Sequence, residues 1–173
     1  YVYCSDEEIC NWLPNPHITF VQRPELLDDN NILLNQILSS FEEKIKADIY
    51  LVQFITCPYL KVNSMVEALM QMIDCGLDSI YSIQRVKSFV DYDNHPLNYN
   101  PLAVERTQDI KHIDIHSNGF YFMSKNVIKM GKRTGHNPQP YMLSDIECID
   151  IDNASDLEFA NMIDYSHSIF PYI

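Results

Sequence analysis

A unit of strand, helix and strand between residues 48 and 83 constrains the fold more than any other part of the sequence. Residues 48–55 are almost continuously apolar, as expected of a strand covered on both faces. That strand ends at Pro58 because proline cannot extend a hydrogen-bonded ladder, and a helix with one apolar face then runs to Gly76. Residues 78–83 return to strand character. Together these elements predict a right-handed crossover in a parallel sheet, and therefore an α/β fold.

Shorter patterns extend this prediction on both sides of the unit. Residues 1–4 and 17–21 are expected to form strands, and an apolar stripe over residues 31–46 indicates a helix. Strand character returns over residues 112–124, where the pair Asn118-Gly119 interrupts it. Such a pair can form a hairpin turn, or it can let the backbone approach a ligand closely, and the sequence leaves both readings open.

The segment 85–111 follows neither the helical nor the strand period and is too long for an ordinary connection. A stretch of this kind is usually a lid, a binding arm or a dimerisation element. Its aromatic residues, among them Phe89, Tyr92 and Tyr99, belong to a class that is enriched at protein interfaces. We therefore expect an arm that forms a homodimer, with a lid over its own subunit as the alternative.

Two acidic residues near the C-terminal end carry the clearest chemical signal. Asp150 and Asp152 alternate with Ile149 and Ile151, which is the period of a short strand that directs both carboxylates to one face. Adjacent like charges are costly unless a cation lies between them, and paired oxygen ligands suit Mg²⁺. We expect a Mg²⁺ site at a strand-to-helix turn, where α/β folds bind ligands. The alternative is a strand edge with two solvated acids.

Length, composition and charge limit the class of protein. A chain of 173 residues, 46% of them hydrophobic, can bury one core, so we expect a single domain over residues 1–173 that begins inside the fold and lacks an N-terminal portion. The five cysteines are odd in number and scattered, which disfavours disulfides and a zinc site. A net charge of −12 disfavours binding to nucleic acid or an anionic membrane. Since the sequence shows no signal peptide and no membrane span, we expect a cytoplasmic protein.

Five motifs in order resemble the CMP-sialic acid synthetase group of cytidylyltransferases, the acylneuraminate cytidylyltransferases. The last motif is similar to the family's metal-binding segment and is the most specific of the five. The resemblance covers most of the chain and implies a Rossmann-like nucleotidyltransferase fold of three layers, with a mainly parallel central sheet and a small dimerisation arm. The motifs are Val2-Tyr3-Cys4-Ser5-Asp6-Glu7-Glu8-Ile9, Arg23-Pro24-Glu25-Leu26, Thr56-Cys57-Pro58, Ser117-Asn118-Gly119-Phe120-Tyr121, and Cys148-Ile149-Asp150-Ile151-Asp152 with Asp156-Leu157.

The resemblance also implies a function. It implies a homodimeric enzyme that activates an acidic sugar with CTP, uses Mg²⁺, and gives a CMP-sugar and pyrophosphate. In that reading Asp150 and Asp152 are the catalytic residues that hold the metal, and Arg23 faces the nucleotide. The residues implied for binding the acceptor are Thr56, Arg106, Gln108 and Asn118.

Three of these residues also have purely structural explanations. Arg106 is equally well explained as a surface arginine on a mobile arm, and Asn118 as part of a turn. Arg23 can form a local salt bridge with Glu25 or Asp28.

The sequence departs from the family pattern in two places. The glycine-rich and basic loop that holds the CTP phosphates in the family is expected before Tyr1. Phe54 and Leu60 align with a glutamine and an arginine of the sialic acid synthetases, which predicts an acidic sugar other than N-acetylneuraminate as the acceptor. Gln53 is one position off, and a one-residue slip on a strand turns a side chain to the opposite face. Two other classes remain open, a non-catalytic relative that acts as a dimeric binding module and a metal-dependent glycosyltransferase.

Overall fold

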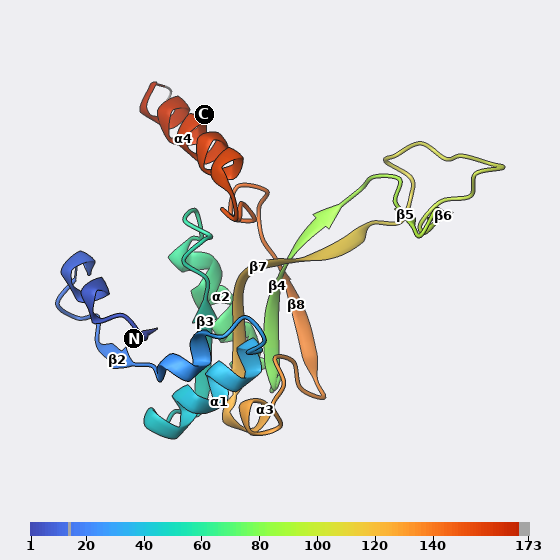
Figure 1. Cartoon of the computed structure of the whole chain (residues 1–173). Coiled ribbons are helices and arrows are strands. Elements are labelled where there is room, and N and C mark those ends of the chain that lie inside the picture. Colours follow the sequence, from blue (N-terminus) through green and yellow to red (C-terminus); the bar gives the residue numbers. More distant parts are fainter. Residues whose placement is uncertain (14, 170–173) are drawn as a thin grey trace.

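The chain has the mixed α/β architecture that its sequence predicts, in a computed structural model that describes residues 1–13 and 15–169 (Figure 1). None of the described helices is both long enough and apolar enough to cross a membrane. In chain order the elements are β1 (Val2–Cys4), η1 (Glu7–Trp12), β2 (Phe20–Gln22), η2 (Glu25–Asp28), α1 (Leu34–Lys44), β3 (Ile49–Gln53), α2 (Val62–Asp74), β4 (Ser79–Val86), β5 (Asp91–Tyr92), β6 (His95–Pro96), β7 (Ile113–Ser124), α3 (Lys125–Lys129), β8 (Pro138–Met142) and α4 (Ala154–Ile169).

The central sheet has four strands in the order β3-β7-β4-β8. Strands β3 and β4 run in the same direction, as expected for a crossover through α2, but β7 lies between them and is antiparallel to both. Strand β8 is parallel to β4, so three of the four strands share one direction. The sequence pattern of the crossover indicates the common direction of β3 and β4. It carries no information about the strand that later enters between them.

Strands β1 and β2 form a separate parallel pair near the N-terminus. Helix α1 connects this pair to the central sheet through Phe41, whose ring contacts Tyr3 of β1 and Tyr50 of β3 with centroid distances of 5.2 and 6.4 Å. The hydroxyl groups of Tyr3 and Ser40 also share a hydrogen bond of 2.8 Å. Each such edge-on ring contact adds about 0.5–1.5 kcal/mol beyond the area that it buries. The aromatic side of α1 therefore sets the position of the small sheet.

Strand β7 supplies core residues to both faces of the central sheet. Tyr121 and Met123 pack against α1 and α3 on one face. Phe120 and Phe122 point to the opposite face and pack against α2. This alternation follows from the two-residue period of a strand, and it produces the three layers of helix, sheet and helix that the sequence predicts.

The segment between β4 and β7 projects from the body of the molecule as an arm (Figure 1). Its base is fixed by Arg85, whose guanidinium donates hydrogen bonds of 2.8 and 2.9 Å to the carboxylate of Asp114. Farther out, the amide of Asn98 donates to the carbonyl groups of Ser88 at 2.9 Å and Lys111 at 3.0 Å. The arm is thus cross-linked from one side to the other and has an ordered path.

The Asn118-Gly119 pair does not form a hairpin turn. Strand β7 continues through it, and the register with β4 shifts between Tyr81 and Ile83, which is a β-bulge. Asn118 adopts a positive φ of 56°. A Cβ atom on Gly119 would lie 3.0 Å from Leu143 Cδ1 and 3.2 Å from Ser82 Oγ, so core side chains approach the backbone closely here and a larger residue would require them to shift.

Ser82 of β4 fills the space that the bulge creates. Its buried Oγ atom accepts hydrogen bonds from the Phe120 amide at 2.9 Å and from the Ser117 hydroxyl at 2.8 Å. The Ser82 hydroxyl also donates to the Phe120 carbonyl at 3.2 Å. One hydroxyl group therefore replaces the ladder bonds that the bulge interrupts, and it fixes the strand next to Asn118.

We predict that Ser82→Ala lowers the free energy of unfolding by about 1–3 kcal/mol, because it leaves the buried Phe120 amide without an acceptor. Urea denaturation followed by circular dichroism measures the loss. Ser39→Ala is the matched control, since the Ser39 hydroxyl on α1 donates to the Asn35 carbonyl four residues earlier, a local contact within one helix. An equal effect of the two substitutions would show that the Ser82 network does not hold the bulge.

Candidate functional site

The acidic loop, residues 143–152 between β8 and α4, carries the two candidate metal ligands. The prediction of a short strand at residues 149–152 is wrong, because these residues form an extended segment without a ladder, directly after a turn at residues 145–148. The ladder with β4 ends at Met142, and no described strand lies beyond it to pair with the alternating residues. The sequence alternation is real, but a strand also needs a neighbour that accepts its backbone hydrogen bonds.

Backbone hydrogen bonds determine the path of the acidic loop. The amide of Cys148 donates to the carbonyl of Ser144 at 3.2 Å, which closes the turn. The amide of Ile151 then donates to the carbonyl of Thr56 at 2.9 Å, which attaches the extended segment to the loop that follows β3. The acidic loop is therefore held at two separate points, and Asp150 lies between them.

Three segments meet at this place, namely the loop after β3, the bulge of β7 and the acidic loop. The Cys57 thiol contacts the carbonyl of Asn118 at 3.7 Å and interacts with the carboxylate of Asp150. Thr56 accepts the hydrogen bond from Ile151. Two of the residues expected to bind the acceptor, Thr56 and Asn118, thus lie beside the acidic loop.

The carboxylate of Asp150 has the property expected of a cation ligand. Its Oδ1 atom is enclosed and has no hydrogen-bond partner among the described residues, whereas Asp152 is exposed. A buried carboxylate oxygen without a donor is costly unless a cation neutralises it. Within the described ranges, no three His, Cys, Asp or Glu side chains gather into a closed metal cage. The enclosed oxygen of Asp150 suits a Mg²⁺ ion that takes most of its other ligands from water and phosphate.

A capping box fixes the start of α4 directly after the acidic loop. The Asn153 side chain accepts hydrogen bonds from the amides of Ser155 at 3.0 Å and Asp156 at 3.2 Å. In return, Asp156 accepts from the amides of Asp152 and Asn153, both at 3.0 Å. The Asp156 carboxylate is occupied in this way and orients the backbone at Asp152.

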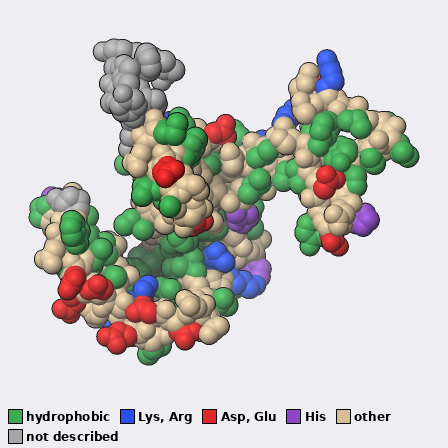
Figure 2. All heavy atoms as spheres, turned by 45° about the horizontal axis from the view of Figure 1, so that its top comes forward, with side chains coloured by type: hydrophobic (Ala, Val, Ile, Leu, Met, Phe, Trp, Pro, Cys, Tyr) green, Lys and Arg blue, Asp and Glu red, His purple; other side chains and the backbone are tan. Residues whose placement is uncertain are grey.

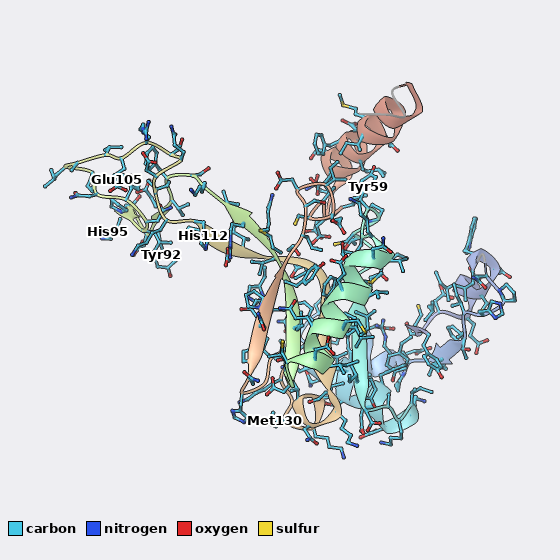
Figure 3. The ribbon with its side chains drawn as sticks, turned by 180° about the vertical axis from the view of Figure 1, so that it is seen from behind. Tyr59, Tyr92, His95, Glu105, His112 and Met130 are labelled. Carbon is cyan, nitrogen blue, oxygen red and sulfur yellow. The ribbon has the colours of Figure 1, made fainter. Side chains whose placement is uncertain are left out.

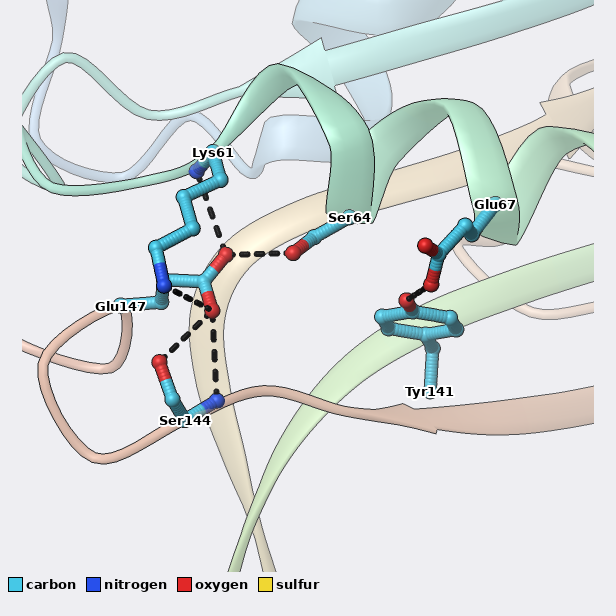
Figure 4. A network of polar contacts seen from close by, with 6 residues as sticks. All are labelled: Lys61, Ser64, Glu67, Tyr141, Ser144 and Glu147. Carbon is cyan, nitrogen blue, oxygen red and sulfur yellow. Dashed lines mark hydrogen bonds and ion pairs between the residues drawn. The ribbon is translucent and has the colours of Figure 1, made fainter.

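Glu147 is a buried residue of the acidic loop that the sequence analysis did not identify; its exposed fraction is 4%. Its Oε1 atom accepts from the Ser64 hydroxyl at 2.5 Å and the Lys61 amide at 3.2 Å, and its Oε2 atom accepts from the Ser144 hydroxyl at 2.7 Å (Figure 4). Burial opposes its ionisation, but the hydrogen bonds from Ser64, Ser144 and Lys61 outweigh that effect and lower the pKa of Glu147. No sequence signal reveals it, because its partners on α2 lie more than eighty positions earlier in the chain.

Arg23 does not contribute to this gathering of loops. It lies just after β2, in the small N-terminal sheet, and forms an ion pair of 2.5 Å with Asp28. Figure 1 shows β2 and the start of α4 in different parts of the molecule. The local salt bridge expected as an alternative is therefore present, although the Nε atom of Arg23 has no partner among the described residues.

Arg106 and Gln108 also lie apart from the acidic loop. Both are exposed on the arm, where Arg106 forms an ion pair with Asp109 and the Gln108 carbonyl accepts from Lys87 at 2.6 Å. In Figure 3 the labelled residue Glu105 marks this part of the arm, far from the other labelled positions on the body. Within one chain, these two residues do not reach the place where the three segments meet.

Comparison with known proteins supports the family resemblance only in part. The chain is 26% identical over 137 residues to N-acylneuraminate cytidylyltransferase A of Danio rerio. The match covers 75% of this chain and 32% of the relative, so the chain spans about a third of the length of the curated protein. It matches no model of a protein family.

Solved structures share the fold. Molybdopterin-guanine dinucleotide biosynthesis protein A from Archaeoglobus fulgidus superposes with a TM-score of 0.51 and 13% identity, over 95% of this chain and 77% of that one. The bifunctional IspDF from Campylobacter jejuni gives a TM-score of 0.54 and 13% identity, over 87% of this chain and 39% of that one. These similarities confirm the predicted Rossmann-like nucleotidyltransferase fold, and at this identity they establish nothing beyond the fold.

We predict that Cys57 is inert toward alkylation in the folded protein. Burial raises its pKa to about 11, and the negative charge of Asp150 adds to that effect. At pH 8 the thiolate fraction is then roughly 100-fold below that of an ordinary exposed cysteine, even before access is considered. Mass spectrometry after iodoacetamide treatment should find Cys10 and Cys75, which are exposed, modified first. Early modification of Cys57 would contradict the enclosed arrangement around Asp150.

Proposed function

We propose that this chain carries the catalytic site of a cytidylyltransferase that couples CTP with an acidic sugar and releases pyrophosphate. The observation that carries the proposal is the enclosed Oδ1 atom of Asp150, which has no hydrogen-bond partner among the described residues and lies where the three segments meet. The sequence similarity to a cytidylyltransferase and the shared fold support the same function. The family resemblance also assigns Arg23 to the nucleotide, but Arg23 lies just after β2 and is paired with Asp28, so it has no part in the metal site proposed here.

The chemistry requires positioning and charge neutralisation. A hydroxyl oxygen of the sugar forms a bond to the α-phosphorus of CTP, while the bond from that phosphorus to the departing pyrophosphate oxygen breaks. Mg²⁺ held by Asp150 and Asp152 would supply the neutralising charge for the phosphate oxygens and can acidify the attacking hydroxyl. The thiols of Cys57 and Cys148 have pKa values raised to about 11 by burial, so neither is an activated nucleophile. Direct transfer between the two substrates therefore fits the residues present.

The residues around the bulge suggest which acceptor the site takes. Thr56 and Asn118 are proposed to bind the acceptor. Phe54 packs against Tyr121 with ring centroids 6.2 Å apart, and Leu60 packs into the core on the other face of the sheet. Because both side chains are apolar and packed inward, neither offers the polar contact expected for N-acetylneuraminate. An acidic sugar other than N-acetylneuraminate is therefore the proposed acceptor.

We expect Asp152→Ala to reduce pyrophosphate release by at least about 100-fold, since a metal ion contributes several kcal/mol of charge stabilisation in the transition state. The assay uses the complete protein, with the residues that precede Tyr1, and combines CTP and Mg²⁺ with a panel of acidic sugars that includes N-acetylneuraminate. Calorimetry with Mn²⁺ and CTP tests binding separately from turnover. In both assays the wild type should respond and Asp152→Ala should not.

The control variant is Glu158→Ala, which removes an exposed acid from α4 just beyond the acidic loop. It should leave turnover and metal binding unchanged. Equal nucleotide-dependent metal binding by Asp152→Ala and wild type would overturn the site assignment. Binding without turnover on any acceptor would instead favour a non-catalytic binding module.

We also propose that the arm forms a homodimer and brings Arg106 and Gln108 to the site of the partner subunit. The argument is the position of these residues, since each is exposed and distant from the acidic loop of its own chain. Hydrophobic side chains lie on the surface of the arm (Figure 2). Among them are Leu102, which is 94% exposed, and Val104, which is 58% exposed. Such side chains are favoured in the buried centre of an interface.

We predict that the wild type is dimeric and that Leu102→Asp with Val104→Asp makes it monomeric, because the charges would be buried without partners. Light scattering over a range of protein concentrations measures the mass. Trp12→Asp is the control, as Trp12 is 81% exposed but lies on η1, outside the arm. A monomeric wild type, or a dimer that survives both arm substitutions, would refute the proposed interface.

A further inference from the structure

The carboxylate of Glu147 joins the acidic loop to the first turn of α2. On α2 it accepts hydrogen bonds from the Lys61 amide at 3.2 Å and the Ser64 hydroxyl at 2.5 Å. On its own loop it accepts from the Ser144 hydroxyl at 2.7 Å and the Ser144 amide at 3.4 Å. The Lys61 ammonium lies 4.0 Å away and is largely exposed, so it adds little. The contact therefore depends on hydrogen bonds to an enclosed carboxylate.

This contact lies three residues before Asp150, so it can fix the position of the Asp150 side chain. Glu147 fixes one end of the short segment that carries Asp150, and the hydrogen bond from Ile151 to Thr56 fixes the other end. Helix α2 begins at the end of the loop that contains Thr56, so both fixed points belong to the same part of the body. The direction of the Asp150 side chain is thus set relative to Thr56 by two anchors.

We propose that Glu147 is the positioning residue of the Asp150–Asp152 site, a role that rests on the metal site proposed above. Its carboxylate fixes the distance between the acidic loop and α2. At this distance Asp150 Oδ1 is enclosed and has no hydrogen-bond donor among the described residues. Residues that orient ligands from outside the coordination sphere commonly change metal affinity 10- to 100-fold when they are replaced. Glu147 touches neither metal nor substrate in this proposal, and it acts only through the path of the loop.

The chemistry of the contact distinguishes a carboxylate from an amide of the same shape. Both oxygens of Glu147 accept from backbone amides, Oε1 from Lys61 and Oε2 from Ser144. A glutamine has one acceptor oxygen and one NH₂ donor, so one of these amides would face a donor instead of an acceptor. Glu147→Gln therefore keeps the volume of the side chain and removes one of its two anchoring functions.

Helix α2 provides a matched control for this experiment. Glu67 accepts a hydrogen bond of 2.7 Å from the Tyr141 hydroxyl and so joins α2 to β8, outside the acidic loop (Figure 4). Glu67 lies on α2 itself, and Tyr141 lies on the strand that leads into the acidic loop. Glu67→Gln therefore changes a second carboxylate contact between these two parts of the molecule. It leaves Glu147 and its donors intact.

The experiment compares wild type, Glu147→Gln and Glu67→Gln of the complete protein, with the residues that precede Tyr1, by two measurements. Hydrogen exchange at the Ile151 amide reports whether the loop keeps its hydrogen bond to Thr56. Calorimetry with Mn²⁺, with and without CTP, reports the affinity of the site. In Glu147→Gln we expect faster exchange at Ile151 and Mn²⁺ affinity reduced about 10-fold, the lower end of the range for orienting residues. In Glu67→Gln both quantities should equal those of the wild type.

The outcomes separate this inference from the proposed function. If the wild type binds Mn²⁺ and Glu147→Gln matches it in affinity and in exchange at Ile151, the positioning role is refuted. If the wild type binds no Mn²⁺ with CTP present, the proposed metal site fails, and the role of Glu147 fails with it. Should Glu147→Gln not fold, Ser144→Ala replaces it, because that variant removes the 2.7 Å hydrogen bond while the carboxylate stays in place. It should shift both measurements in the same direction by a smaller factor.

Discussion

Strand β7 is the element on which the rest of the structure depends, because it lies between β3 and β4 and packs against helices on both faces of the sheet. Phe120 and Met123 are fully buried on opposite faces, so any shift of β7 by one residue would exchange the two halves of the core. The bulge opposite Ser82 is the one irregularity in this strand's pairing with β4. At the bulge Asn118 is exposed, and it lies at the place where the loop with Thr56 and the acidic loop with Asp150 also meet.

The folding pattern was readable from the sequence wherever a local period determined the element. The apolar run of β3, the amphipathic face of α2 and the capping residue Gly76 predict the crossover, and the structure contains it. The insertion of β7 between β3 and β4 depends on residues distant in the chain, so no local pattern announces it. For the same reason, the alternating residues around Asp150 suggested a strand that has no partner.

In the candidate site, too, some residues are predicted by a local sequence pattern, whereas others depend on contacts with distant parts of the chain. The spacing of Asp150 and Asp152 predicts a metal site, and that remains a prediction; of the two carboxylates, only Asp150 has an enclosed oxygen without a hydrogen-bond partner among the described residues. Arg23 was assigned from a motif, yet its guanidinium is paired with Asp28 in another part of the molecule. Glu147 has no local sequence signal, since its hydrogen bonds form only when the start of α2 and the acidic loop are brought together.

A buried carboxylate such as Glu147 is an expensive way to hold a loop, because removing a charge from water costs several kcal/mol unless hydrogen bonds replace the lost solvation. A hydrophobic side chain could fill the same space at lower cost. Its packing is not directional, however, and would fix the position of the acidic loop relative to α2 less closely than hydrogen bonds do. Hydrogen bonds from two backbone amides and two hydroxyl groups specify both distance and direction. In the proposed role of Glu147, such directional control sets the position of Asp150 relative to Thr56, and a carboxylate that accepts four hydrogen bonds can supply it.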